Sequence, residues 1–371
     1  MDLGYSESEQ MIKTTAREFL ERECPKSLVR AMEEDDTGYP RELWQRMAGL
    51  GWMGLIFPEE YGGSNDTFLA LVLLIEEMGR ALLPGPFIAT VVCGGLPILY
   101  YGSEAQKEEY LPKIAAGDIV LTQAFIAPDL PTTRPEVEEM VVVKDGSYIL
   151  SGVKLFAPYA HIADCLVYSS RVTEEDTLFL VDAKQSEVKS SVLPSIGSDK
   201  QCEVVLNNMP VSETNVLGKK GQGQEIIGKI GEWGSLAQCG FILGELERVL
   251  EMTVEYAKQR VQFNKPIGSF QSIQHQCADM VMDIDTTKFL TYQAAWKLSQ
   301  QVPATKEISL AKARASDASK RVCLLGVKVH GGIGIMEDHD MSLYYRKAKA
   351  GEIAFGDGDF HREIVAQQLD L

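Results

Sequence analysis

The stretch MVVVKDGSYILSG, residues 140–152, decides the fold, because it brings a clear β signal into a chain whose preceding segments read as helices. Two runs rich in β-branched and aromatic residues flank Lys144-Asp145-Gly146, which is typical of a hairpin turn. Three further runs of strand length follow with turns between them, namely CLVYSSRV, TLFLVDA and CEVVLNNM. We therefore expect residues 119–222 to form a small antiparallel β-barrel or sandwich.

Helical periodicity flanks this β-rich region on both sides. Before it, EQMIKTTAREFLERE, RELWQRMAGLGWMGL and TFLALVLLIEEMGRALL place apolar residues at i, i+3 and i+4. After it, an apolar stripe leads to Arg260, and a second amphipathic helix ends at Gly331-Gly332. The stripe consists of Leu243, Leu246, Leu250, Val254 and Ala257. The sequence thus predicts an α+β protein with an N-terminal helical domain (1–118), a middle β-domain (119–222) and a C-terminal helical domain (223–371).

Composition excludes several classes of partner. The 371 residues include 36 Lys and Arg against 53 Asp and Glu, and this net charge of −17 argues against nucleic acid or an anionic membrane as partner. The polar start MDLGYSESEQ is not typical of a signal peptide. The apolar stretch PFIATVVCGGLPILYYG is broken by Gly94, Gly95 and Pro97, so we expect a bent buried helix and no membrane span.

The cysteines indicate a reducing compartment. Seven are scattered along the chain without a C-x-x-C pair, so we expect no disulfide framework and no metal site. These features together predict a cytoplasmic protein.

Four motifs, taken together, resemble the acyl-CoA dehydrogenase family over essentially the whole chain. They are LGWMGLIFPEEYGGSN (50–65), MPVSETNVLGKKGQG (209–223), RVQFNKPIGSFQSIQHQCADM (260–280) and VHGGIGIMED (329–338). The resemblance implies a C-terminal four-helix bundle and an FAD cofactor. It also implies a reaction in which a carboxylate removes a proton from Cα of an acyl-CoA while Cβ delivers hydride to the flavin. Electrons would then pass to an electron-transfer flavoprotein.

The family's catalytic carboxylate has no counterpart at either of its usual positions. Aligning REIVAQ with the family's final helix puts Phe355 at the site of the base. A minority of the family carries the base on an earlier helix just before an Arg, and those two sites read Gly234 and Ser235 here. Asp357 or Glu232 could act as a relocated base, although a misplacement of about 1 Å can cost about 10²-fold in rate. Asp357 reads equally as the N-cap of the last helix.

The resemblance also implies losses around the flavin ring. The loop that carries Thr, Glu, Ser and Asp in the family has Ile126, Ala127, Thr132 and Thr133 at those places. The next strand has Phe156-Ala157-Pro158 where the family has Trp-Ile-Thr. Proline has neither a side-chain hydroxyl nor an N–H, so it cannot supply the usual hydrogen bond to the ring.

The residues that contact the ADP half of FAD in this family are kept. An Arg can clamp a diphosphate bidentately, and paired glycines let the backbone approach it closely, although a Gly pair alone also reads as a helix C-cap. In the family these groups reach the FAD of a neighbouring subunit. The residues kept at the matching positions are Arg260, Phe263, Gln271, Gly331 and Gly332. Lys328 stands where the family has a Gln before the glycines, and it can still partner a phosphate.

The losses and retentions together predict a subunit that works in a heteromer, expected to be a tetramer, with a related and catalytically complete chain. This chain would complete the FAD site of its partner, and the complex would dehydrogenate an acyl-CoA whose acyl group the sequence does not reveal. Two alternatives stay open. The chain could be a self-sufficient dehydrogenase with Asp357 or Glu232 as base, or a protein that binds acyl-CoA or partners without redox chemistry.

Overall fold

The computed structural model describes residues 6–128, 141–144, 147–173 and 175–371. The positions Thr132, Thr133, Asp145 and Gly146 discussed above lie outside these ranges. The chain forms two compact units, each built from segments far apart in sequence. The first comprises Met1–Arg30, Thr67–Leu83 and Ser235–Leu371, and the second comprises Ala31–Asp66 and Pro84–Gly234.

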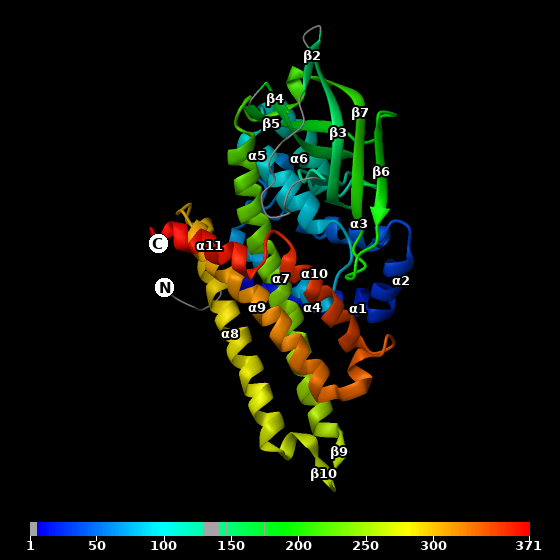
Figure 1. Ribbon diagram of the computed structural model, residues 1–371, viewed down its shortest axis with the longest axis vertical. Helices are drawn as coiled ribbons and strands as arrows, with labels where there is room; N and C mark the ends of the chain where they lie inside the picture. Colours follow the sequence, from blue (N-terminus) through cyan, green and yellow to red (C-terminus); the bar gives the residue numbers. More distant parts are fainter. Residues whose placement is uncertain (1–5, 129–140, 145–146, 174) are drawn as a thin grey trace. The chain divides into compact units, whose positions relative to one another are not determined.

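Helices occupy both ends of the chain and strands occupy the middle, which confirms the predicted α+β class (Figure 1). The N-terminal helices are α1 (Glu7–Glu23), α2 (Lys26–Glu34), α3 (Arg41–Gly49), α4 (Phe68–Ala81), α5 (Leu96–Tyr101) and α6 (Glu104–Ala115). The strands that follow are β1 (Leu121–Ala124), β2 (Val142–Lys144), β3 (Ser147–Pro158), β4 (Cys165–Val172), β5 (Glu175–Asp182), β6 (Val188–Leu193), β7 (Gln201–Ser212) and β8 (Val216–Leu217). The C-terminal part of the chain holds α7 (Gly223–Gln259), the hairpin β9 (Val261–Gln262) and β10 (Lys265–Pro266), α8 (Gln271–Ser299), α9 (Thr305–His330), α10 (Asp340–Ile353) and α11 (Gly358–Gln368). The domain boundaries at 118 and 222 remain predictions.

Among the described residues of the first unit, the regular structure is helical apart from the β9–β10 hairpin. Within it, α9 packs against α8, α10 and α11, and α4 packs against α1 and α8. Glycines bring α4 and α7 into backbone contact, since a Cβ added at Gly244 would lie 1.8 Å from the carbonyl oxygen of Glu76. Buried charges are paired across these helices: Arg17 forms a salt bridge with the buried Glu77, and Tyr292 donates a 2.5 Å hydrogen bond to the carboxylate of Glu76.

The second unit holds two four-stranded sheets, ordered β1-β4-β5-β8 and β2-β3-β7-β6. Strands β2 and β3 pair antiparallel with Lys144 opposite Ser147, which confirms the hairpin expected between them. The expectation of purely antiparallel pairing is wrong for one pair, because β1 and β4 run parallel. The chain leaves the first sheet after β1 to form β2 and β3 of the other sheet, and it returns in the same direction as β4.

The apolar stretch near residue 90 is a buried, irregular helix. A π-helix (Ile88–Gly95) continues into α5, and the hydroxyl of Thr90 donates a 3.0 Å hydrogen bond to the carbonyl of Leu121 at the start of β1. Across the described ranges, every helix is too short or too polar to cross a membrane. All seven thiols are free, and all but Cys277 are buried.

Candidate functional site

Position 355 lies in the turn between α10 and α11. Phe355 is half-buried and adopts a left-handed backbone with φ 58°, which is unusual for an aromatic residue. Gly356 follows with φ 98°, and a Cβ added there would lie 2.2 Å from the ring of Phe360. The backbone of this turn is therefore held in a specific strained geometry around the side chain at 355.

The carbonyl of Phe355 is bonded by two side chains from different helices. Ser235, buried on α7, donates from its hydroxyl over 3.5 Å, and Nε2 of His361 on α11 donates over 3.0 Å. Burial, reinforced by the charge of Lys312, lowers the pKa of His361 to about 4. His361 is therefore neutral at physiological pH, which leaves its Nδ1 free to accept the 3.3 Å contact from Ser309.

Both candidate substitute carboxylates are engaged in local structure. Asp357 is the N-cap of α11, and its Oδ1 accepts a 2.9 Å hydrogen bond from the backbone N–H of Phe360. Glu232 forms a 2.9 Å ion pair with Lys229 one turn earlier on α7. Gly234, at the other possible base position, is buried within the same helix.

The end of β3 presents few hydrogen-bonding side chains. Phe156 has φ 56° and is 45% exposed, and Pro158 pairs with Gln201 on β7. Between them, Ala157 is buried. The backbone of Ile126 is occupied by a 2.7 Å hydrogen bond from the N–H of Leu155. None of these side chains offers a hydroxyl or an N–H group.

At the C-terminal end of α7 the chain makes a tight hairpin. Phe263 (φ 52°) and Asn264 (φ 63°) form its two-residue tip, and two successive positive φ values are what a type I′ turn requires. The side chain of Phe263 is 85% exposed, although it makes an edge-to-face contact with Phe270 at 6.0 Å. The exposed Arg260 and Gln271 flank this hairpin, so the structure brings three of the predicted cofactor residues to one end of the first unit (Figure 1).

The glycine pair lies where α9 ends. Gly331 caps the helix with φ 68° and ψ −148°, a conformation that is open essentially only to glycine. Gly331 and Gly332 are both exposed, and a Cβ added to either would meet no other atom within 4 Å. Packing within this chain therefore does not require a glycine at 332. Close approach of a group from outside the chain would require one.

An aromatic stack links this turn to α7. His330, which is buried, stacks on Tyr256 with ring centroids 4.5 Å apart, and its Nδ1 donates to the carbonyl of Gly326 over 2.8 Å. Tyr256 lies one turn before Arg260, so the stack places the Gly331 turn beside the C-terminal end of α7. Lys328, exposed on the last turn of α9, lies in the same region.

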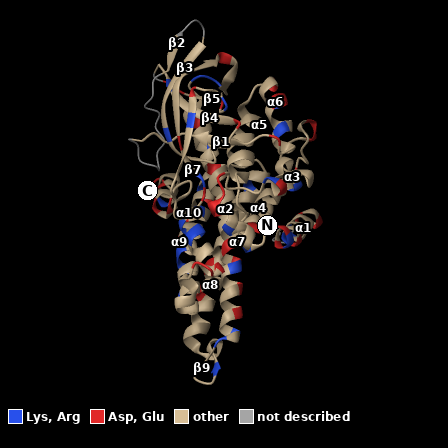
Figure 2. Ribbon diagram, turned by 90° about the vertical axis from the view of Figure 1, so that its right-hand side faces the viewer, with Lys and Arg blue, Asp and Glu red and all other residues tan. Residues whose placement is uncertain are grey.

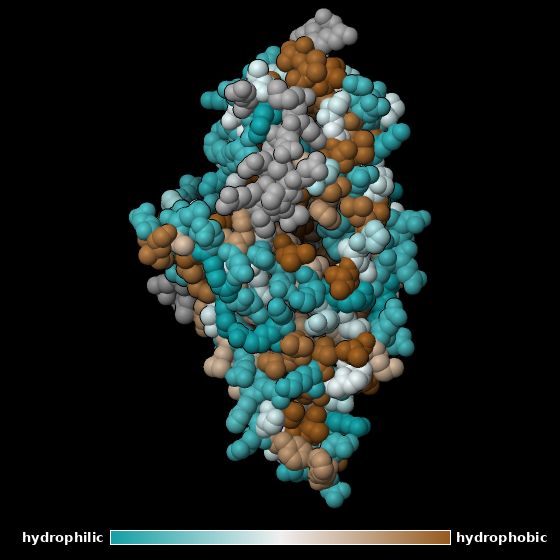
Figure 3. Space-filling model, in the orientation of Figure 1, coloured by the Kyte–Doolittle hydropathy of each residue, from teal (hydrophilic) through white to brown (hydrophobic). Residues whose placement is uncertain are grey.

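The surface of the first unit combines mixed charge with exposed apolar side chains. Both acidic and basic positions are seen on the helices of this unit (Figure 2). Figure 3 shows brown apolar atoms among hydrophilic ones over this unit. The exposed apolar residues of the region include Val261, Met282, Phe289, Trp296, Ile333, Ile335 and Met336.

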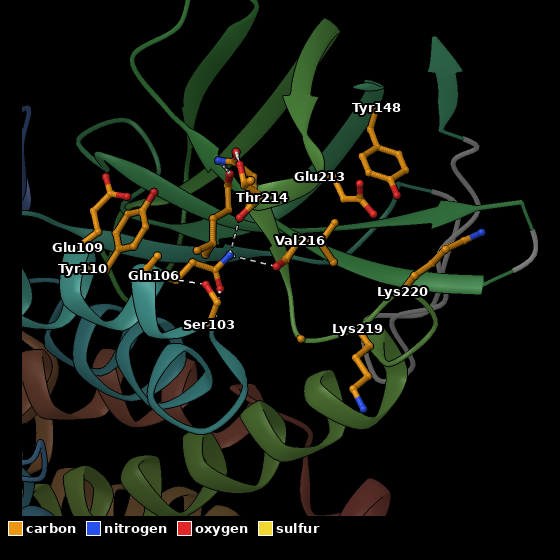
Figure 4. A pocket seen from close by; sticks show the side chains of 14 residues that line it. Ser103, Gln106, Glu109, Tyr110, Tyr148, Glu213, Thr214, Val216, Lys219 and Lys220 are labelled. Atoms are coloured by element: carbon orange, nitrogen blue, oxygen red, sulfur yellow. Dashed lines mark hydrogen bonds between the residues drawn. The ribbon is translucent and has the colours of Figure 1, made fainter. Parts of the chain in front are cut away.

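Two cavities lie away from all of these residues. In the second unit, a groove of about 740 Å³ is lined by residues that include Tyr110, Tyr148 and Lys219 (Figure 4). Gln106 closes part of it by donating hydrogen bonds to the carbonyls of Thr214 and Val216. A smaller cavity of about 260 Å³ in the first unit is lined by Lys26, Arg80, Arg248 and other residues. No residue predicted from the sequence lines either cavity.

Sequence reasoning missed Lys312 and His361, which both bond the turn at 355. A signal for Lys312 was present, because it lies on the apolar face of its helix together with Ile308, Ala311 and Ala315. His361 gave no such signal.

Comparison with known proteins assigns both ends of the chain. The family model for the acyl-CoA dehydrogenase N-terminal domain matches residues 6–118, and the model for the acyl-CoA dehydrogenase C-terminal domain matches residues 221–369. An acyl-CoA dehydrogenase of Bacillus subtilis is 31% identical, with 98% of each chain covered. A caffeyl-CoA reductase–Etf complex subunit of Acetobacterium woodii is 28% identical over 98% of this chain and 99% of its own length. Among solved structures, a chain of the ChsE4–ChsE5 complex of Mycobacterium tuberculosis matches with a TM-score of 0.92 and 27% identity, covering 100% of this chain and 99% of that one.

Proposed function

Because the chain belongs to the acyl-CoA dehydrogenase family, we propose that it serves as a heteromeric subunit that completes the FAD site of a catalytically complete relative. Homologues in this family are FAD-dependent oxidoreductases. The complex would carry out α,β-dehydrogenation of an acyl-CoA, with electrons leaving through an electron-transfer flavoprotein. The observation that carries this proposal is the phenyl ring of Phe355 at the place of the family's base.

The contacts of the two nearby carboxylates speak against either of them as a relocated base. A general base must be free to accept the substrate proton, and it must lie within hydrogen-bond reach of that proton. Asp357 already accepts the N–H of Phe360, and Glu232 is paired with Lys229. This favours a subunit without its own base over a dehydrogenase with a relocated one.

The first unit keeps residues that fit the ADP half of FAD. The two exposed glycines leave open space where a Cβ would otherwise project, and Arg260 and Lys328 are exposed cations near them. Arg260 would hold the diphosphate, and the backbone at Gly331 and Gly332 would approach it closely. When bound, FAD supplies a flavin that accepts hydride from the acyl chain.

At its described positions, the second unit offers little to the flavin ring. Ile126, Ala127 and Pro158 provide no side-chain donor toward a ring, and Pro158 also lacks the backbone N–H. The chain thus has residues that fit the ADP half of FAD and few that fit the flavin ring. This difference supports a chain that contributes contacts to the FAD of another chain. A chain of the ChsE4–ChsE5 complex is among the structural relatives, and a subunit of a reductase–Etf complex is among the sequence relatives.

The test is FAD occupancy of a co-expressed complex after substitution in this chain. The partner should be a complete acyl-CoA dehydrogenase chain from the same genome, and FAD should be measured by visible absorbance per partner polypeptide. Arg260→Ala removes charge-assisted hydrogen bonds and should weaken FAD binding by about tenfold or more. Lys258→Ala, which removes an exposed charge two residues earlier on α7, is the matched control and should leave occupancy unchanged.

Two outcomes would contradict the proposal. If Arg260→Ala and Lys258→Ala give the same occupancy as the parent, the contact in trans is absent. If no complex with any family chain carries flavin, a non-redox binding role becomes the better account.

A further inference from the structure

Lys312, in the middle of α9, is completely buried and yet bonded at all three ammonium hydrogens. Its Nζ donates to the hydroxyl of Ser316 over 2.8 Å, to the carbonyl of Glu352 over 3.1 Å and to the carbonyl of Gly356 over 2.8 Å. An ammonium group has three donors and no acceptor, so these three oxygens match it completely. Two of them are backbone carbonyls, that of Glu352 in the last turn of α10 and that of Gly356 in the α10–α11 connection.

The protonated form of Lys312 is the one that these contacts need. Burial lowers the pKa of Lys312 to about 8 and is the largest cause of this shift. The charges of Asp357 and Glu352 oppose it. The side chain therefore keeps its proton at neutral pH and can use all three donors. A neutral amine would have only two donors for three acceptors.

Three helices converge on the carbonyl groups of this connection. The carbonyl of Glu352 accepts from Lys312 and from Ser316, the latter over 2.9 Å. The carbonyl of Phe355 accepts from Ser235 on α7 and His361 on α11, and the carbonyl of Gly356 accepts from Lys312. A left-handed φ at a non-glycine residue persists only where the surroundings over-determine it, and this set of bonds does so.

We propose that Lys312 is a positioning residue: its hydrogen bonds to the carbonyls of Glu352 and Gly356 hold the turn 354–357 in the left-handed geometry that fixes the direction of the side chain at 355. The importance of that direction rests on the proposed function, which identifies 355 as the base position of the family. The hydrogen bonds of Lys312 and the geometry of the turn do not depend on that function. In this proposal the chain lacks the carboxylate at 355, while hydrogen bonds from Lys312 still fix the direction of the side chain there.

The experiment measures the local order of a spin label at position 355 by electron paramagnetic resonance. A Phe355→Cys variant in a Cys277→Ser background presents one accessible thiol, because the other native cysteines are buried. We expect a strongly restricted label in this parent. Adding Lys312→Met should shorten the rotational correlation time of the label by about twofold or more. Ser316→Ala, which removes one member of the network, should have a smaller effect in the same direction.

The matched control is Lys320→Met, which removes an exposed lysine from the same helix and should leave the spectrum unchanged. A label at Lys320→Cys reports on α9 itself and should stay equally ordered with and without Lys312→Met. That result separates local positioning from general loss of stability. If Lys312→Met fails to fold, Ser316→Ala becomes the deciding variant.

The proposal is overturned if the label at 355 is already freely mobile in the parent. It is also overturned if Lys312→Met, or Ser316→Ala in its place, leaves the label as restricted as Lys320→Met does. These outcomes require neither flavin nor a partner chain, so they do not affect the heteromer proposal. Conversely, unchanged FAD occupancy in Arg260→Ala would leave the role of Lys312 intact.

Discussion

Ser235 and Phe355 lie 120 residues apart in the sequence, and the hydroxyl of Ser235 donates a 3.5 Å hydrogen bond to the carbonyl of Phe355. From the family resemblance we expect an Arg at position 235, beside one possible base position, and a Glu at position 355, the other. The chain has Ser and Phe at these two positions. The two departures meet in space. In the subunit that we propose, Ser235 and His361 thus hold the backbone at the position where the base is missing, through hydrogen bonds to the carbonyl of Phe355.

Phe355→Glu alone should not create dehydrogenase activity in this chain. The substitution restores a carboxylate, but the end of β3 still lacks a hydrogen-bond donor for a flavin ring, because Pro158 is unchanged. The measurement uses a complex whose partner has its own base replaced by Gln, and it follows bleaching of the flavin by acyl-CoA. Bleaching well above that of the unsubstituted complex would show a working flavin site in this chain's own β-domain.

Gly332→Ala should lower FAD occupancy of the complex without lowering stability. A methyl group at 332 meets no atom of this chain within 4 Å, so it obstructs only a group from outside. The matched control is Gly244→Ala, whose methyl would lie 1.8 Å from the carbonyl oxygen of Glu76 and should destabilise the fold by about 1–3 kcal/mol or more. Thermal unfolding of both variants checks this, and equal destabilisation would show that Gly332 has a packing role.

Glu245→Gln should stabilise the chain at alkaline pH. Glu245 is 1% exposed on α7, and burial raises the pKa of its carboxyl well above the usual 4.5. A group whose folded-state pKa is raised contributes stability below its unfolded pKa, and loses that contribution as pH rises through the folded pKa. Glutamine avoids the buried charge, so we expect a gain of about 1–3 kcal/mol at pH 8 that shrinks toward pH 5.

The control for this prediction is Glu247→Gln, two residues along the same helix. Glu247 is half-buried and accepts a 3.2 Å bond from Lys288, so its substitution should destabilise or be neutral. Denaturant unfolding at several pH values measures both variants. A Glu245→Gln variant that is less stable than the parent at pH 8 would mean that the ionised carboxylate is satisfied inside the fold.

Phe263→Gly should separate folding from association. A bulky residue at φ 52° costs about 1 kcal/mol relative to glycine, so the isolated chain should be as stable as before or slightly more stable. Removal of an 85% exposed ring should weaken association with a partner chain. Sedimentation of mixtures measures association. Unchanged association together with unchanged FAD occupancy would remove Phe263 from the proposed contact surface.

Much of the fold could be predicted because it follows from local patterns. Helical periodicity predicted α9 and its end at Gly331, and the Lys144-Asp145-Gly146 signal predicted the pairing of β2 with β3. The parallel pairing of β1 with β4 could not be predicted, since it depends on how the chain crosses between two sheets. The division into two discontinuous compact units likewise arises from contacts between segments far apart in sequence.

At the site, the sequence predicted which residue types are missing, and the structure adds what takes their place. The sequence predicts that a carboxylate is missing at 355, whereas the left-handed backbone there and the bonds to this turn from Lys312, Ser235 and His361 appear only in the structure. Similarly, the motif around Phe263 is visible in the sequence. Its position on an exposed type I′ tip appears only once the hairpin is formed.

The central claim is that this chain completes another chain's flavin site and does not operate its own. The most direct measurement is the ratio of FAD to polypeptide, read from the visible spectrum, for the chain purified alone and for its complex with a complete relative. We predict a colourless isolated chain and a yellow complex with one FAD per partner chain. An isolated chain that carries one FAD per polypeptide, and whose flavin is reduced by an acyl-CoA, would contradict the account.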